Sequence, residues 1–198
     1  MAASIRAGCL TKVGIFPIPF ISMMWSRCRR VWPRLFGSSR PAIYWSVRSL
    51  DLVAVIDPKT LRVKWWRNGL WVREHDPDWL PDGMISVYNN QPRDRHSMGR
   101  SRLIGIDPAT FQTKTLFDGR PVQVYSTIWG KHEILSDGSL LITLSQQRRV
   151  LHVTRDGRVM MELLNRFDER RNLLLFEAQF FALDFFDFDF KELNCASS

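Results

Sequence analysis

An internal repeat limits what this chain can fold into more than any other feature of its sequence. The stretch VAVIDPKT, from Val53 to Thr60, returns as LIGIDPAT from Leu103 to Thr110, which places Asp57 and Asp107 roughly 50 residues apart. Each copy is an apolar, β-branched run that ends in an Asp-Pro turn and is followed by a second run that ends at a glycine. A complete β-hairpin is therefore repeated along the chain.

A different hairpin lies between these copies and is repeated too. It reads WLPDGMISVY from Trp79 to Tyr88 and ILSDGSLLIT from Ile134 to Thr143, and each copy has an Asp-Gly turn. A third, looser copy of the first hairpin runs from Val150 to Leu164. Four strands in each repeat of roughly 50 residues are typical of a β-propeller blade. We therefore predict an all-β fold made of propeller-type blades of four antiparallel strands.

The number of strands predicts an incomplete ring. Residues 43–164 hold about ten strands, which make about two and a half to three blades, whereas propellers close with about four to eight. The predicted organisation is an atypical basic and apolar segment over 1–40, blades over 41–165 and a Phe-rich extension over 166–198. An unclosed stack leaves strand edges uncovered, so we expect a fragment of a longer protein, self-association through open blade edges, or a partner that completes the ring.

The positive charge of the chain is concentrated near its N-terminus. The formal net charge is +8, and residues 1–50 contain eight of the 28 basic residues and no carboxylate. The other 148 residues therefore carry 20 basic and 20 acidic groups. Balanced blades lack the basic face that phosphate-driven binding requires, so we predict no nucleic-acid partner.

The segment 1–40 leaves three interpretations open. Residues 13–25 are apolar, lie between basic residues and are interrupted by Pro17 and Pro19, and they are too short to span a bilayer comfortably. The segment is a secretory signal or membrane anchor, an organelle-targeting peptide, or a start that does not belong to the fold. Nothing in its composition requires it to be folded.

The C-terminal extension is dominated by phenylalanine. Seven of the 13 phenylalanines lie within residues 173–190, at a spacing that fits neither a strand nor a helix. We interpret this run as hydrophobic material that closes the fold, because each aromatic side chain has a large area to bury.

Familiar catalytic and metal-binding motifs are missing from the sequence. It contains no GxSxG, P-loop, HExxH or Gly-rich dinucleotide turn. Its cysteines, Cys9, Cys28 and Cys195, show no metal-ligand spacing, so we predict no metal. The strongest chemical candidate is His75, which stands between Glu74 and Asp76 in the segment WVREHDPDWLPDGMISVYNN, residues 71–90.

This segment resembles the QHDP-x-x-LPNG-N-x-LxFDN pattern of bacterial arylsulfate sulfotransferases and their relatives. Residues 45–57, 100–110, 134–149 and 165–178 resemble further stretches of the same family in the same order, so the resemblance covers residues 41 to about 180. It implies a six-bladed propeller whose central histidine takes a sulfuryl group from a phenolic sulfate ester and passes it to another phenol. No nucleotide donor and no cofactor are implied.

Carried over by position, the resemblance assigns roles to individual residues. His75 becomes the nucleophile and Arg48 the group that binds sulfate and stabilises charge. Arg149, Asn90 and Trp79 become candidates for substrate binding, the tryptophan by stacking on a phenolic ring. A neutral imidazole is a competent nucleophile near neutral pH, and a guanidinium offers paired donors to sulfate oxygens. The implied location is the periplasm or a membrane, and without the resemblance the cytoplasm.

The sequence also departs from the family pattern, which keeps a second function open. Glu74 replaces a glutamine and brings a carboxylate close to the incoming sulfate ester, YNN replaces FDN, and residues 1–40 contain no histidine that could assist. His75 could instead brace a turn, and Arg48 could form an ordinary ion pair with Asp51. The alternative is a non-catalytic propeller fragment that acts as a binding or interaction segment, or the product of a degraded gene.

Overall fold

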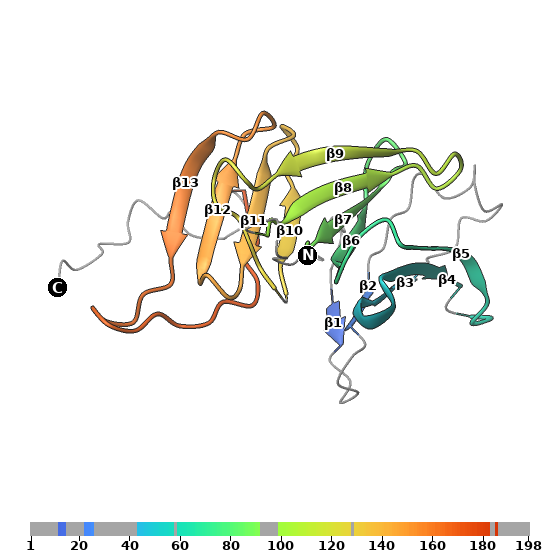
Figure 1. The fold of residues 1–198 in the computed structure, drawn as a ribbon, viewed down its shortest axis with the longest axis horizontal. Coiled ribbons are helices and arrows are strands. Elements are labelled where there is room, and N and C mark those ends of the chain that lie inside the picture. The colour runs from blue at the N-terminus through green and yellow to red at the C-terminus, as the bar shows by residue number, and fades with distance from the viewer. Residues whose placement is uncertain are drawn as a thin grey trace, which may run out of the picture.

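The protein consists of three antiparallel β-sheets that follow one another along the chain (Figure 1). The computed structural model describes residues 12–14, 22–25, 43–57, 59–91, 99–127, 129–182 and 185. The first sheet contains β1 (Lys12–Gly14), β2 (Ser22–Trp25), β3 (Ile43–Val47), β4 (Leu52–Ile56) and β5 (Val63–Asn68). The second contains β6 (His75–Trp79), β7 (Ile85–Asn89), β8 (Arg102–Ile106) and β9 (Thr113–Asp118). The third contains β10 (Lys131–Ile134), β11 (Leu140–Leu144), β12 (Arg149–Val153) and β13 (Val159–Leu164).

Each sheet is a meander in which neighbouring strands follow one another in sequence. The predicted all-β class, with blades of four antiparallel strands in an open stack, is confirmed. One difference concerns the segment 1–40, which was not expected to fold. It supplies β1 and β2, and β2 pairs with β3 so that Met23 lies opposite Trp45. Its short apolar runs are separated by prolines, and tertiary pairing rather than periodicity defines them as strands.

The sequence repeat is also a repeat of hydrogen bonds. Asp57 Oδ1 accepts the backbone N–H groups of Lys59 and Thr60 at 2.9 and 3.2 Å, and Asp107 Oδ1 accepts those two and three positions further on at 2.7 and 3.2 Å. Leu61 and Phe111, which end the two turns, both adopt a positive φ. The same aspartate chemistry therefore builds the same turn in the first and second blades.

Two hydrophobic clusters hold the blades face to face. Val53, Val55 and Trp65 of the first sheet pack against side chains of the second sheet such as Ile85 and Ile106. A second cluster joins the second sheet to the third, and its buried members are Tyr88, Leu103, Phe117, Val124, Leu140, Ile142, Leu144, Leu151 and Val153. Packing of the sheets stabilises the stack, because the apolar side chains of both facing sheets are removed from contact with water.

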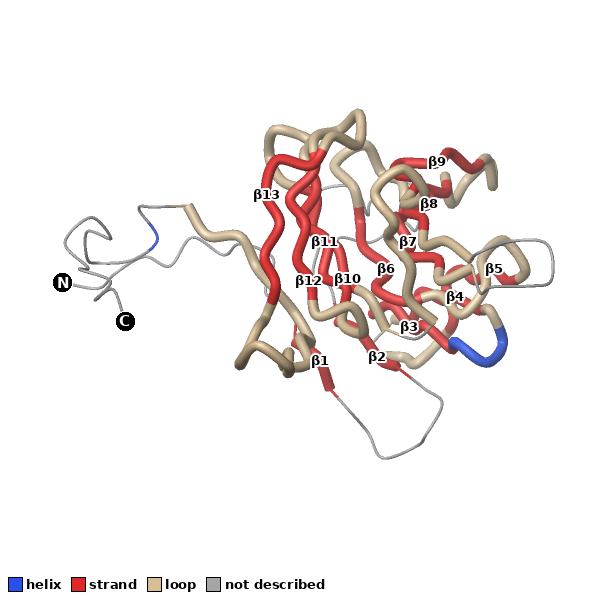
Figure 2. The backbone as a smooth tube through the Cα atoms, turned by 60° about the vertical axis from the view of Figure 1, so that its left-hand side comes forward, coloured by secondary structure: helices blue, strands red, loops and turns tan. Residues whose placement is uncertain are grey.

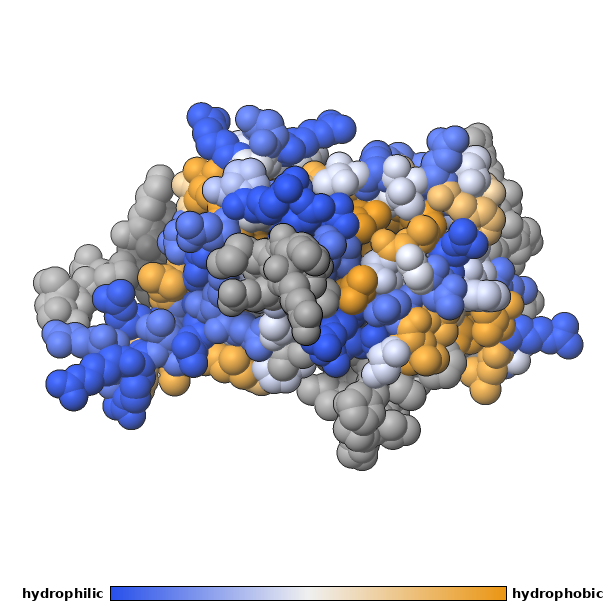
Figure 3. Space-filling view, in the orientation of Figure 1, coloured by the Kyte–Doolittle hydropathy of each residue, from blue (hydrophilic) through white to orange (hydrophobic). Residues whose placement is uncertain are grey.

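The two ends of the stack differ in how they are covered. Part of the C-terminal extension lies along the third sheet, where the Ala178 N–H donates to Thr143 Oγ1 at 3.0 Å and Lys131 pairs with Glu177 at 2.6 Å. The phenylalanines of this stretch stay largely exposed, Phe176 by 64%. At the other end, hydrophobic side chains gather at the surface over β5, where Val63 and Trp66 are exposed (Figure 3).

Candidate active site

The ends of several strands meet at one edge of the stack. His75 begins β6, and β6 lies beside β2 and β3 of the first sheet and beside β10 of the third. Arg48 follows β3 and opens the 3-10 turn Arg48–Leu50, which lies at the end of the first sheet in Figure 2. Asn90 follows β7, and Arg149 begins β12, so Arg48, Asn90 and Arg149 belong to equivalent connections in three successive blades. The antiparallel topology brings these connections to the edge at which β6 begins.

His75 is a buried, neutral imidazole. Its side chain accepts the backbone N–H of Trp129 at Nε2, with a distance of 3.1 Å, so Nε2 carries the lone pair and Nδ1 carries the proton. Burial, together with the charge of Arg48, lowers the pKa of His75 to about 4, and the charge of Asp76 partly opposes this shift. A neutral ring is the form that a nucleophilic histidine needs near pH 7, and in this structure its Nε2 lone pair is occupied by the Trp129 N–H.

The backbone at Trp129 is fixed in an uncommon conformation. Trp129 has a φ of 62°, and its carbonyl oxygen accepts Asn90 Nδ2 at 3.2 Å. The next residue, Gly130, has a φ of 147° and packs so closely on the Tyr88 ring that a Cβ there would overlap it. His75 thus binds the N–H of Trp129, and Asn90 binds its carbonyl oxygen.

Asn90 therefore has a structural partner on both of its amide atoms. Its Oδ1 accepts the Ser101 hydroxyl at 3.3 Å, and its side chain is fully buried. The structure places Asn90 close to His75 through the peptide of Trp129. A direct role of Asn90 in binding substrate stays a prediction.

Arg48 provides positive charge near His75. Its Nε is buried and has no hydrogen-bond partner among the described residues. Burial lowers the pKa of Arg48, as does the charge of Arg73, while Glu74 and Asp51 raise it. The expected ion pair with Asp51 is not among the ion pairs of the described chain, and Asp51 Oδ1 instead accepts the N–H of Arg73 at 2.7 Å. An orphan donor beside a neutral histidine fits an anionic ligand.

Glu74 is a buried carboxyl group on the other side of His75. Its side chain is fully buried, Oε1 accepts the Ser46 hydroxyl at 3.1 Å, and Oε2 has no partner among the described residues. Burial raises the pKa of Glu74 to about 7, although its hydrogen bonds partly oppose the change. The sequence identified Glu74 as an unfavourable negative charge. Burial removes much of that charge near neutral pH, and no local pattern could have revealed this.

Arg149 and Trp79 have partners of their own in the structure. Arg149 pairs with Glu162 of β13, with 2.8 Å between Nε and Oε1, on the outer half of the third sheet. Trp79 ends β6, at the opposite end of the strand from His75, and packs against the hydrophobic cluster between the first two sheets. Their roles in substrate binding stay predictions. His96 lies outside the described residues.

Neither a metal centre nor a membrane helix is found in the part of the chain that the structure describes. It contains no group of three or more His, Cys, Asp and Glu side chains that could hold a metal ion. Across the same residues, no helix combines the length and the apolar character needed to cross a membrane.

Comparison with known proteins places this arrangement in a family. A search of curated proteins finds no significant match. One similar solved structure is the 1.35 Å crystal structure of a protein of unknown function from Bacteroides caccae. Its TM-score is 0.43 and its identity 14%, and the match covers 62% of this chain and 42% of that chain, so this chain spans less than half of that protein. A family model for arylsulfotransferase (ASST) matches residues 43–166, which include β3 to β13. The chain belongs to the arylsulfotransferase (ASST) family.

Proposed function

We propose that this chain carries a sulfuryl-transfer site in which His75 receives the sulfuryl group of a phenolic sulfate ester and passes it to a phenol. The observation that carries the proposal is the neutral state of His75, with its lone pair on Nε2 and the charge of Arg48 nearby. Family membership supports a sulfate ester as donor and a phenol as acceptor in general terms.

The transfer divides into two displacements at sulfur. In the first, His75 Nε2 forms a bond to sulfur while the bond between sulfur and the phenolic oxygen breaks, and the phenolate leaves. In the second, the hydroxyl oxygen of an acceptor phenol attacks the same sulfur, and the N–S bond breaks so that Nε2 regains its lone pair. The acceptor hydroxyl releases its proton, which compensates the charge of the phenolate that left in the first step. A covalent histidine intermediate divides one difficult transfer into two easier ones.

Two groups are suited to stabilise charge during these steps. Arg48 has an orphan Nε and a guanidinium that can donate to the sulfuryl oxygens, and to the phenolic oxygen that gains charge as the S–O bond breaks. The Trp129 N–H occupies the Nε2 lone pair in the resting site, so the attack requires this hydrogen bond to break. The released N–H can then donate to a sulfuryl oxygen.

The direct test is sulfuryl transfer from 4-nitrophenyl sulfate to an added phenol, followed by nitrophenolate release. We expect release that depends on the acceptor and is lost in His75→Ala. His75→Gln is the matched control, because it keeps an amide near the position of Nε2 without a nucleophilic lone pair. Release that is equal in wild type and both variants would overturn the proposal.

The alternative function is a non-catalytic propeller segment that binds a ligand or partner. It is favoured by one observation, the Trp129 N–H that already occupies the lone pair of His75. Under this alternative, a sulfate ester binds through Arg48 without turnover. Calorimetric binding of 4-nitrophenyl sulfate that Arg48→Ala abolishes, in a sample that releases no nitrophenolate, would select this function.

A further inference from the structure

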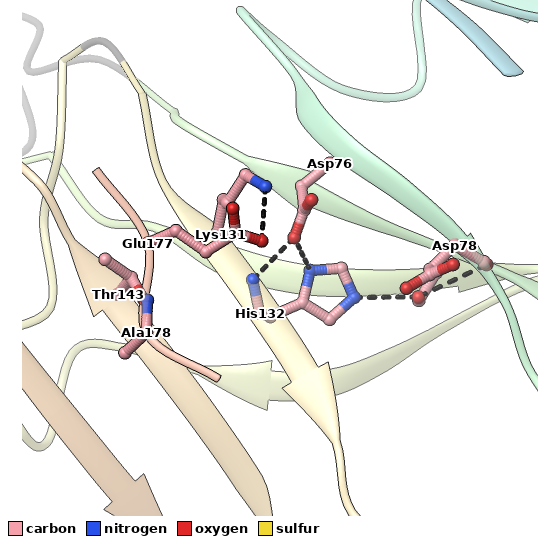
Figure 4. A network of polar contacts seen from close by, with 8 residues as sticks. Asp76, Asp78, Lys131, His132, Thr143, Glu177 and Ala178 are labelled. Atoms are coloured by element: carbon pink, nitrogen blue, oxygen red, sulfur yellow. Dashed lines mark hydrogen bonds and ion pairs between the residues drawn. The ribbon is translucent and has the colours of Figure 1, made fainter. Parts of the chain in front are cut away.

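A buried chain of polar side chains links the second and third blades directly behind His75. Asp76 Oδ2 accepts the backbone N–H of His132 at 2.6 Å and lies 3.0 Å from the ring atom Nδ1 of the same residue (Figure 4). The other ring nitrogen, Nε2, lies 2.8 Å from Ser86 Oγ. All three side chains are buried, and Ser86 is fully so. Nε2 is thus at hydrogen-bond distance from Ser86, whereas Nδ1 faces the Asp76 carboxylate at ion-pair distance without an aligned hydrogen bond.

This series of polar side chains contacts β6 where the strand that begins with His75 is irregular. Asp76 has a φ of 53°, and the pairing of β6 with β7 shifts its register between His75 and Asp78. A left-handed conformation is uncommon for aspartate and persists only where surrounding contacts enforce it. Pro77 follows and cannot donate a ladder hydrogen bond. The contacts of Asp76 with His132 lie at this bulge.

The segment that leads into β10 delivers the hydrogen bond to the His75 ring. His132 lies in β10, three residues after Trp129, whose N–H donates to His75 Nε2 at 3.1 Å. A shift of β10 relative to β6 would therefore change both the bulge that presents His75 and the N–H that orients its ring. Because reacting groups must be placed within about 1 Å for efficient chemistry, this attachment matters for turnover.

We propose that His132 and Asp76 form a buried clamp that positions the His75 imidazole, with Ser86 holding the far side of the His132 ring. The inference rests on the proposed function for its role in sulfuryl transfer. It makes His132 and Asp76 positioning residues, because neither reaches the reacting atoms.

Two amide substitutions at His132 separate its two ring contacts. His132→Asn places an amide nitrogen where Nδ1 faces Asp76 and gives up the contact with Ser86. His132→Gln reaches the position of Nε2, near Ser86, and gives up the ring contact with Asp76. The two variants are similar in polarity, so a general loss of packing affects both, whereas the clamp predicts that only the glutamine variant misplaces His75.

The readout is the His75 ring itself, followed by nitrogen-15 NMR of labelled histidine. The chain has four histidines, so single substitutions assign the signals. In the wild type and in His132→Asn we expect His75 to stay neutral down to a pKa of about 4, with Nε2 unprotonated. In His132→Gln we expect its titration to move toward the ordinary value of 6.5, because the ring loses its fixed, buried position.

Turnover of 4-nitrophenyl sulfate gives the second readout. We expect kcat to fall about 100-fold in His132→Gln and KM to change by less than about threefold, since alignment rather than binding is lost. Titrations of His75 that coincide in the two variants would overturn the clamp. If the wild type transfers no sulfuryl group, the proposed function fails while the NMR titration still decides the clamp.

A second pair of variants covers the case in which His132→Gln does not fold. Asp76→Asn keeps an acceptor and tolerates a left-handed backbone, whereas Asp76→Gly keeps the backbone freedom and removes the acceptor. The clamp predicts that the asparagine variant retains the wild-type tautomer of His75 and that the glycine variant does not. Retention of that tautomer in Asp76→Gly would overturn the proposal.

Discussion

The imidazole of His75 and the backbone N–H of Trp129 are joined by a hydrogen bond of 3.1 Å, although 54 residues separate them in the chain. This bond fixes which nitrogen of His75 carries the lone pair, and it crosses from the second blade to the third. The reactive state of the histidine therefore depends on how two blades are placed relative to each other.

The pKa of His75 predicts a loss of stability in acid. This pKa is about 4 in the folded protein, against an ordinary value of 6.5. Between pH 6.5 and pH 4 the unfolded chain therefore binds a proton at His75 that the folded protein does not bind. We expect this group to lower the free energy of unfolding by about 3 kcal/mol as the pH falls from 6.5 to 4. Urea unfolding of wild type and His75→Gln at pH 7 and pH 4.5 measures the difference.

The control for this prediction is the variant itself, which has no titrating ring at position 75. Its unfolding free energy should fall less between the two pH values than that of the wild type. An equal fall in both proteins would mean that the His75 ring titrates normally in the folded state.

Glu74 predicts a change in the opposite direction. Its pKa is about 7 when folded and 4.5 as an ordinary value, so the unfolded chain ionises first and stability is lost as the pH rises from 4.5 to 7. Glu74→Gln removes this loss, and we expect it to raise the free energy of unfolding at pH 8 by about 3 kcal/mol and to leave it nearly unchanged at pH 4.5. Urea unfolding at both pH values measures the effect.

The same substitution predicts a gain in activity above pH 7. Ionised Glu74 opposes the charge of Arg48 and repels a sulfate ester, so Glu74→Gln should raise kcat/KM for 4-nitrophenyl sulfate several-fold at pH 8, and much less at pH 6. Ser46→Ala is the comparison, because it removes one hydrogen bond to the carboxyl group but keeps a group that can ionise. A gain of equal size at both pH values would contradict an electrostatic origin.

Gly130 predicts a steric requirement beside the site. In Gly130→Ala the new methyl group overlaps the Tyr88 ring and the residue keeps a positive φ, so we expect a loss of about 3 kcal/mol in the free energy of unfolding. Gly69→Ala is the matched control, because Gly69 also has a positive φ but has open space around it. Its loss should be about 1 kcal/mol, which reflects backbone strain alone. Equal losses would remove the steric explanation.

The last strand predicts self-association. All six residues of β13 are exposed, and within the described chain no strand pairs with its outer edge. An uncovered edge and apolar side chains such as Met161 and Leu163 favour association between copies. Sedimentation velocity should show larger species as concentration rises, and Met161→Lys with Leu163→Lys should reduce them. Leu61→Lys, in an exposed turn of the first blade, should not.

Much of the fold was predictable because it is encoded locally. Asp57 and Asp107 build the same turn through hydrogen bonds to residues two and three positions away, and Asp-Gly pairs close the intervening hairpins. Such short-range hydrogen bonds form again wherever the same residues recur in the sequence. β1 and β2 were missed because their strand character depends on pairing with β3, which the letters of residues 12–25 do not show.

The candidate site was predictable only in its residue types. His75 and Arg48 were found through a motif and stand at the same edge of the blades. The environment that gives them their chemistry comes from elsewhere in the chain: Trp129 determines the tautomer of His75, Ser46 holds the Glu74 carboxyl group, and His132 supports the bulge after His75.

The sequence by itself therefore determined the blades and their order, because hairpins are short-range structures, and its contiguous motif singled out His75 as a candidate. Only the tertiary structure decided that His75 is neutral, that Glu74 retains a proton near pH 7, and that a buried pair of residues from two blades lies behind the imidazole. The physical reason is that burial and hydrogen-bond partners, which set protonation and orientation, arise where segments distant in sequence pack together.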